Sequence, residues 1–196
     1  MRLGPQAPWL PFEARQILSP HRGFVWRATV GRGLRTFVGG DQYAEGRGAV
    51  RFWLWGALPV VRAGGGSSAR DVARSAIGRM AAEAVWAPAA LLPSRGVRWT
   101  SPSDEAAVAA FGIDREPVEV ALTLDPAGAV RRVQLARWGN STDDRRYAAI
   151  PFGAGVTADT RFGGYTIPTE LAVSWCFGTD RPFEFIRVTV HSATFG

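Results

Sequence analysis

The single cysteine and the two histidines are the side chains best suited to nucleophilic catalysis or to metal binding. Cys176 lies in an alternating, strand-like segment, where a lone Cys is usually a small core side chain. A catalytic Cys needs a His within hydrogen-bond reach, and His191 on a neighbouring predicted strand would have to supply it, although residues of adjacent strands also meet by chance. One Cys excludes a disulfide framework and a multi-thiolate zinc site, and His21 stands far from His191 in the sequence. With no Gly-x-Ser-x-Gly motif either, the sequence predicts no catalytic residue, no metal and no cofactor.

Glu83 is the carboxylate best placed for acid–base chemistry. It borders the apolar stripe of a predicted helix, just before Trp86. A glutamate that faces a closed hollow at this point could act as a general acid or base. The competing interpretation is an ion pair with an arginine such as Arg137. Asp41 and Glu170, both at predicted strand boundaries, complete a weak acidic constellation.

A glycine-rich run is the nearest match to a phosphate-binding loop. Gly64-Gly65-Gly66-Ser67-Ser68 precedes a predicted helix, where free backbone N–H groups favour anions. The run lacks the Gly-Lys-Ser/Thr ending of a P-loop and follows no parallel-sheet pattern. We therefore interpret it as a flexible hinge leading to a helix that covers a hollow.

Tryptophan is the most informative residue type of the chain. The sequence holds 8 Trp, 11 Phe and 3 Tyr, and most of the Trp fall on predicted strands or at the end of the predicted helix. Aromatic side chains usually build a core, but so many indole rings are hard to close-pack and also suit the wall of an apolar cavity. Both interpretations stay open. If the rings line a cavity, we predict that its ligand-binding residues are six tryptophans, one glutamate and one arginine: Trp26, Trp53, Trp86, Trp99, Trp138, Trp175, Glu83 and Arg137.

The elements that must position these residues are mostly strands. Apolar and polar residues alternate between turn signals, of which Asp125-Pro126-Ala127-Gly128 is the strongest for a hairpin. A polar loop, Asn140–Arg146, separates the middle of the chain from its end. The predicted strands, about ten in number, are Gly23–Val30, Leu34–Val38, Glu45–Trp55, Leu58–Ala63, Val97–Thr100, Glu105–Phe111, Val118–Leu124, Val130–Arg137, Thr160–Ile167, Glu170–Phe177 and Phe183–Phe195.

One helix is predicted, over Ser68–Ala87. Ser68 is its expected N-cap and Asp71 completes a capping-box-like pair, while Pro88 ends it. Its apolar stripe is narrow and rich in alanine, which suits close contact with a sheet. The stripe consists of Val72, Ala73, Ala76, Ile77, Met80 and Ala84.

These elements predict a mainly β (α+β) fold in a single domain, residues 1–196. We expect a curved, antiparallel half-barrel sheet with the helix packed on its concave face, since the elements show no βαβ alternation. A closed barrel and a two-sheet sandwich are the alternatives.

An aromatic and glycine framework runs through nearly the whole chain. In combination, its motifs resemble a family of uncharacterised bacterial proteins, a domain of unknown function. The motifs are Pro11-Phe12-x-Ala14-x-Gln16, Phe24-x-Trp26-x-Ala28, Gly40-Asp41-x-Tyr43-x-x-Gly46-x-Gly48, Glu83-x-x-Trp86-x-Pro88-x-x-Leu91-Leu92-Pro93, Arg137-Trp138-Gly139, Pro151-Phe152-Gly153, Phe162-Gly163-Gly164-Tyr165-Thr166-Ile167-Pro168 and Trp175.

The order of elements is also remotely similar to the lipoprotein-localisation (LolA/LppX-type) superfamily of half-barrels. That resemblance implies a curved sheet around an apolar cavity that holds a lipid or an acyl chain. Members of the nearer family carry a segment before the Pro11-Phe12 motif, so we also expect the N-terminal segment to be truncated here.

Charge is concentrated in the first third of the chain. All 23 basic residues are Arg. Residues 1–70 contain ten Arg and three acidic residues, whereas residues 71–196 contain thirteen Arg and fourteen acidic residues. The N-terminal arginines are spaced singly, as on a solvated strand face, so we predict no nucleic-acid binding. A basic third can still make peripheral contact with an anionic membrane surface. No apolar window is long enough to span a bilayer and no signal peptide begins the chain, so the sequence predicts a cytoplasmic protein.

Taken together, the residues favour a binding module without catalytic activity, whose partner is a lipid, an acyl chain or another hydrophobic small molecule. The alternative is an enzyme, a hydrolase or isomerase that acts on a hydrophobic substrate through a buried acid such as Glu83. An interaction protein without a pocket would instead show an exposed apolar patch.

Overall fold

Two antiparallel sheets and one principal helix make up the computed structural model, which describes residues 1–141 and 144–196. Residues 142 and 143 of the predicted loop Asn140–Arg146 lie outside the described residues. The first sheet contains β1 (Phe12–Ser19), β2 (Gly23–Val30), β3 (Phe37–Ala44), β4 (Arg47–Leu54) and β5 (Leu58–Ala63). The second contains β6 (Arg98–Ser103), β7 (Ala106–Ile113), β8 (Glu116–Leu124), β9 (Val130–Gly139), β10 (Ala148–Phe162), β11 (Tyr165–Trp175) and β12 (Phe183–Thr189).

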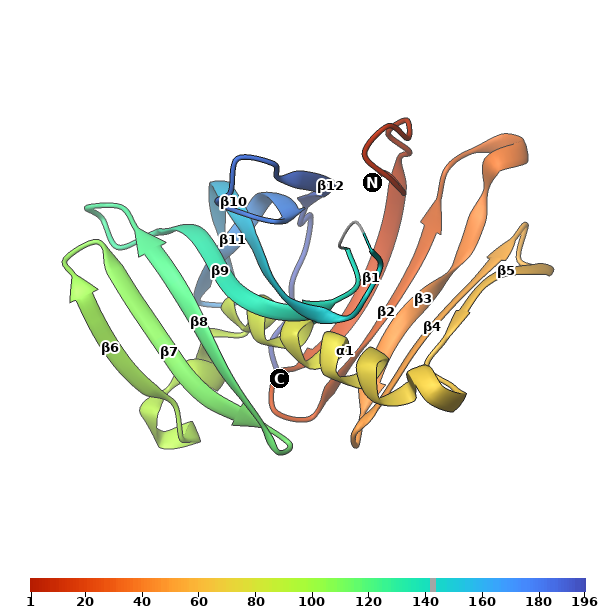
Figure 1. Ribbon diagram of the computed structural model, residues 1–196. Helices are drawn as coiled ribbons and strands as arrows, with labels where there is room; N and C mark the ends of the chain where they lie inside the picture. The colour runs from red at the N-terminus through yellow and green to blue at the C-terminus, as the bar shows by residue number, and fades with distance from the viewer. Residues whose placement is uncertain (142–143) are drawn as a thin grey trace.

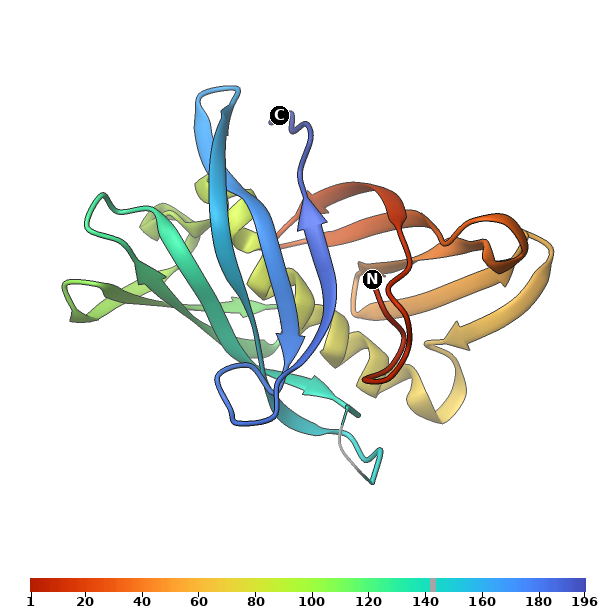
Figure 2. The same ribbon diagram turned by 90° about the horizontal axis from the view of Figure 1, so that it is seen from above.

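Within each sheet, every strand pairs with its neighbour in the sequence, which confirms a mainly β, antiparallel fold with one main helix. The prediction of one continuous sheet is wrong, because no strand pairing joins the two sheets within the described residues, and the half-barrel shape is not confirmed. The physical reason lies at the helix: the five strands before α1 (Ala69–Glu83) pair with one another, the seven after it do the same, and the helix separates β5 from β6 in the chain. The N-terminal segment contacts the free edge of β12, where the Arg2 N–H donates to the Phe185 carbonyl over 2.8 Å. Figures 1 and 2 show this segment between β12 and β1.

The helix α1 (Ala69–Glu83) lies between the sheets, so the alternative of two sheets packed face to face is also wrong (Figure 1). It begins after the glycine run and continues as a 3-10 turn, η3 (Ala84–Trp86), close to the predicted end. The predicted capping pair is wrong, because the Ser68 hydroxyl donates to the Gly65 carbonyl and the Asp71 carboxylate accepts instead from the indole of Trp138. The predicted apolar stripe is confirmed, since all six of its residues are buried.

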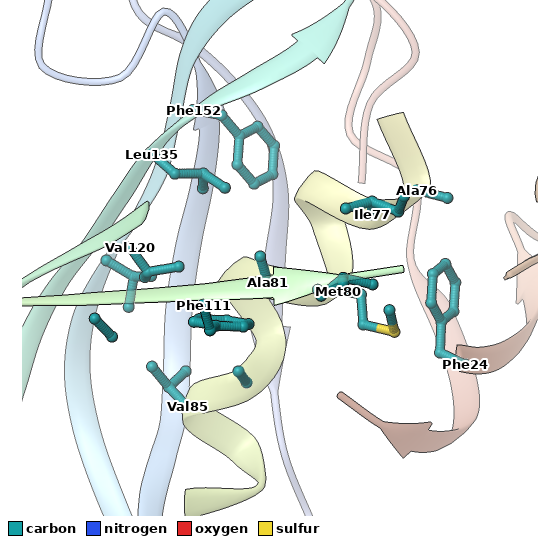
Figure 3. Packing of buried hydrophobic residues seen from close by; sticks show 14 of the residues in the cluster. Phe24, Ala76, Ile77, Met80, Ala81, Val85, Phe111, Val120, Leu135 and Phe152 are labelled. Carbon is teal, nitrogen blue, oxygen red and sulfur yellow. The ribbon is translucent and has the colours of Figure 1, made fainter. Parts of the chain in front are cut away.

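The core lies where α1 meets the inner faces of both sheets. Figure 3 shows Phe24 of β2 beside Met80, while Phe111, Leu135 and Phe152 approach the helix from the second sheet. Small residues allow this close approach: a Cβ on Gly48 would lie only 3.0 Å from the Cα of Ala73. The helix therefore holds the two sheets at a fixed separation on one side.

Turns explain where strand prediction succeeded and where it failed. The Asp125 hairpin is confirmed, because its Oδ1 accepts from the Ala127 and Ala129 backbone N–H groups and joins β8 to β9. The predicted strand Thr160–Ile167 is wrong: Gly163 and Gly164, with φ of 54° and 91°, turn the chain from β10 into β11. Two successive residues at positive φ are what a tight hairpin requires.

Candidate ligand-binding cleft

A cleft of about 2370 Å³ opens between the two sheets above α1. Its walls come from β1–β3 on one side and from β10–β12 with the following residues 190–196 on the other. The helix and η3 supply Arg79, Ala82, Glu83 and Trp86. Because the lining includes residues from both faces of β1 and β2, the hollow continues around the β1 edge onto the outer face of the first sheet.

Three of the six predicted tryptophans share the inner part of this cleft. Trp26 projects from β2 toward the helix, and its ring centroid lies 5.1 Å from the Arg79 guanidinium carbon. Trp86 spans from η3 to the second sheet, where its indole N–H donates to the Pro168 carbonyl over 2.9 Å. Trp175 packs edge-on against Phe152 with ring centroids 5.0 Å apart. The cleft thus has an indole on each wall and one on its floor.

The other three tryptophans are not brought to the same place. Trp53 pairs with Val38 on the outer face of the first sheet, opposite to Trp26, and borders only the outer part of the hollow. Trp99 lies on the edge strand β6, 39% exposed and outside the cleft lining. Trp138 contacts the first turns of α1 instead. Its indole N–H donates to Asp71 Oδ1 over 2.8 Å, and the Arg74 guanidinium carbon lies 4.1 Å from the centroid of its ring.

Replacing Trp138 by Phe is expected to destabilise the protein by about 1–3 kcal/mol, because the partly buried Asp71 carboxylate loses its donor. Trp99→Phe is the matched control, since its indole N–H bonds only to an exposed backbone carbonyl, that of Leu91. Urea unfolding of both variants measures the difference. Equal losses for the two would show that the Trp138 bond does not secure the helix.

Arg79, which was not predicted as a site residue, organises the polar side of the cleft. Its Nε donates to Glu83 Oε1 over 2.8 Å and its Nη1 to Asp41 Oδ2 over 2.7 Å, and all three side chains are mostly buried. Gln16 completes the group: it accepts from Arg79 Nη2 and donates to Glu83 Oε2, both over 3.0 Å. Burial alone would lower the pKa of Arg79, but the charges of Glu83 and Asp41 outweigh this and raise it. The i,i+4 spacing of Arg79 and Glu83 on one helix was the sequence signal that could have found this pair.

The interpretation of Glu83 as the ion-pair partner of an arginine is confirmed, but that arginine is Arg79 and not Arg137, which forms no ion pair among the described residues. Arg137 is 9% exposed and lines the cleft from β9. Its Nε donates to the Ser75 carbonyl over 3.0 Å and its Nη2 reaches the Ser75 hydroxyl at 3.4 Å. Its guanidinium carbon lies 4.5 Å from the Phe152 ring centroid and 4.8 Å from that of Trp175.

Burial, followed by the charge of Arg79, lowers the pKa of Arg137 to about 10. The side chain therefore remains a cation at neutral pH. Its Nη1 has no hydrogen-bond acceptor within the part of the chain that the structure describes. The charges of Asp41 and Glu83 act on Arg137 from a distance and oppose this lowering of its pKa, but no carboxylate of the described residues bonds to it directly. A buried cation without a bonded carboxylate favours an anion that can reach it.

The remaining catalytic candidates are not assembled. Both carboxylate oxygens of Glu83 are engaged, and Glu170 stands on the exposed side of β11. Cys176 follows the end of β11 that pairs with Phe183, whereas His191 lies beyond the opposite end of β12, roughly 20 Å away along the strand. Among the described residues no three His, Cys, Asp or Glu side chains gather as metal ligands would. The absence of a metal and of a cofactor stays a prediction.

Taken together, fold and site define a mainly β protein whose two antiparallel sheets enclose an open, helix-floored cleft. Residues 1–195 match the family described as "Family of unknown function (DUF6920)", and the chain belongs to this family. No curated protein and no solved structure matches it, so the remote resemblance to the lipoprotein-localisation superfamily gains no support. Among the described residues, no helix has the length and apolar character needed to cross a membrane.

Proposed function

We propose that this protein binds a hydrophobic small molecule with an acyl chain, and holds it in the cleft without altering it chemically. The observation that supports the proposal most directly is the cleft itself. Its volume of about 2370 Å³ exceeds the roughly 300–1,000 Å³ usual for small-molecule sites. This volume includes the part of the hollow on the outer face of the first sheet, and we assign the acyl chain to the inner part, between the two sheets.

The lining supports an apolar chain as the occupant. Aliphatic side chains of the second sheet form one wall, and the rings of Trp26, Trp86 and Trp175 lie on both walls and the floor. Ligand sites of this kind combine a mostly apolar surface with a few polar groups that fix orientation. The aliphatic lining comprises Ala154, Ile167, Leu171, Val173 and Val188.

Arg137 supplies the polar group that fixes orientation. Its guanidinium is buried, lacks a carboxylate partner in the described chain, and lies against two aromatic rings. A guanidinium fork matches a carboxylate in shape as well as in charge. We therefore assign the ligand a carboxylate head group that binds Arg137, with its chain along Trp175 and the aliphatic wall.

A cleft-filling substitution tests the proposed function. Organic extraction of the purified protein followed by mass spectrometry is expected to yield an acyl-chain acid. Ala14→Trp places a ring in the cleft from an exposed position on β1, and we expect it to reduce the extracted amount severalfold. Ala121→Trp, at an exposed position of β8 outside the cleft lining, is the matched control.

The proposal fails if the wild-type extract is empty and added dodecanoic acid does not bind. It also fails if Ala14→Trp and Ala121→Trp retain the same amount of ligand as the wild type.

A further inference from the structure

Four arginines form a straight row across the outer face of the first sheet. The strand register places Arg15 opposite Arg27, Arg27 opposite Gly40, Gly40 opposite Arg51, and Arg51 opposite Arg62. Directly opposed residues point to the same side of a sheet, and neighbouring strands lie about 4.8 Å apart. The row therefore crosses all five strands over roughly 20 Å. We call Arg15, Arg27, Arg51 and Arg62 the arginine row.

The charges of the arginine row are not neutralised within the described residues. All four side chains are exposed, and none forms an ion pair or a hydrogen bond with another described residue. One carboxylate, Glu13, stands on the same face two positions before Arg15. Like charges directly opposite one another destabilise a sheet, so the row carries a cost that an external anionic surface would remove.

Apolar side chains flank the row on both sides. Ile17 is paired with Val25, and they are 77% and 39% exposed; Val38, paired with Trp53, is 40% exposed. This face lies opposite to the one that packs on α1, because Trp26 and Asp41, the partners of Arg79, point the other way. The face thus combines cations in one plane with exposed aliphatic groups and an indole. Surfaces that lie on a lipid interface have this composition.

We propose that the outer face of the first sheet docks on an anionic lipid membrane, with the arginine row on the lipid phosphates and the flanking apolar side chains at the headgroup level. A nucleic acid would use the cations equally well, but the exposed aliphatic groups of Ile17, Val25 and Val38 offer it neither stacking nor hydrogen bonds. The row starts at β1, the strand that also borders the cleft. This proposal rests on the arginine row and its apolar neighbours, and it does not depend on whether the cleft binds a ligand.

Vesicle co-sedimentation tests the proposal. The wild-type protein is expected to bind phosphatidylcholine vesicles that contain phosphatidylglycerol, to bind pure phosphatidylcholine vesicles weakly, and to be released by salt. Arg15→Gln/Arg27→Gln/Arg51→Gln should weaken binding by at least about tenfold, since each arginine near an anionic surface contributes roughly fivefold. Because the variant also relieves like-charge opposition, its melting temperature should not fall.

The control removes the same charge from other faces: Arg98→Gln/Arg115→Gln/Arg161→Gln changes three exposed arginines outside the first sheet. This variant should bind the anionic vesicles as the wild type does. The proposal is overturned if the wild type ignores these vesicles, or if the control loses as much binding as the row variant. Row-dependent binding to a DNA or RNA oligonucleotide without vesicle binding would likewise overturn it in favour of a nucleic-acid surface.

Discussion

Replacing Arg137 by Met is expected to reduce the affinity for dodecanoic acid by at least about tenfold, while dodecanol binds as before. The acid loses a charge-assisted partner at the buried guanidinium, whereas the alcohol has the same chain and no charge to lose. For the same reason the wild-type protein should prefer the acid to the alcohol. Isothermal titration calorimetry with both compounds measures the two preferences.

Arg132→Met is the matched control for this prediction. Arg132 lies on the same strand, β9, but it is exposed on the other face and does not line the cleft. Arg137→Lys keeps the charge without the fork and should retain part of the preference for the acid. Equal affinity of the wild type for acid and alcohol would refute the head-group assignment and leave the acyl-chain proposal intact. Tighter, Arg137-dependent binding of dodecyl phosphate would assign a phosphate head group instead.

Replacing Arg79 by Met is expected to cost about 3 kcal/mol of stability or more, because two mostly buried carboxylates lose their common cation. Asp41 is already short of partners, since its Oδ1 is buried without a hydrogen bond among the described residues. Gln16 donates to Glu83 and not to Asp41, so it does not replace Arg79 as a donor to Asp41. Chemical denaturation monitored by circular dichroism provides the measurement.

A second arginine between two acids provides the control. Arg131 bonds to Asp125 and Asp159 as Arg79 does to its pair, but on the surface, where its side chain is 36% exposed. Arg131→Met should therefore destabilise the protein much less, because solvent replaces the lost pairing. If the two variants lose the same stability, burial of the Arg79 group is not what makes it important.

The helix shows which parts of the fold can be predicted from sequence. Its apolar stripe repeats at a helical period that no other segment shares, and the buried residues are those the period indicates. The hairpin at Asp125 is equally local, since one side chain supplies the turn's hydrogen bonds. Local signals of this kind depend on a few neighbouring residues, so they can be read without the tertiary structure.

The division into two sheets could not be predicted in this way. It depends on strand pairing over the whole chain: β5 and β6, on either side of the helix, do not pair, and neither do β1 and β12 within the described residues. The same limit applies to the site: Arg79 joins residues of β1, β3 and α1, and only the assembled sheet register brings them together. Trp26 and Trp53 looked equivalent in sequence, but they pair with Asp41 and Val38 of β3, which are three positions apart and therefore point to opposite faces of the sheet.

Contact quenching of tryptophan fluorescence by a dibrominated stearic acid tests most directly whether an acyl chain occupies the cleft. Bromine quenches an indole only when the two touch. Trp26, Trp86 and Trp175 line the inner part of the cleft, and Trp9 and Trp53 also border the hollow. We predict saturable quenching of the wild type, its loss in Trp26→Phe/Trp86→Phe/Trp175→Phe, and its retention in Trp99→Phe/Trp138→Phe, because those two indoles lie outside the lining. Absence of quenching in the wild type, or quenching that is undiminished after the removal of the three inner indoles, would contradict the account.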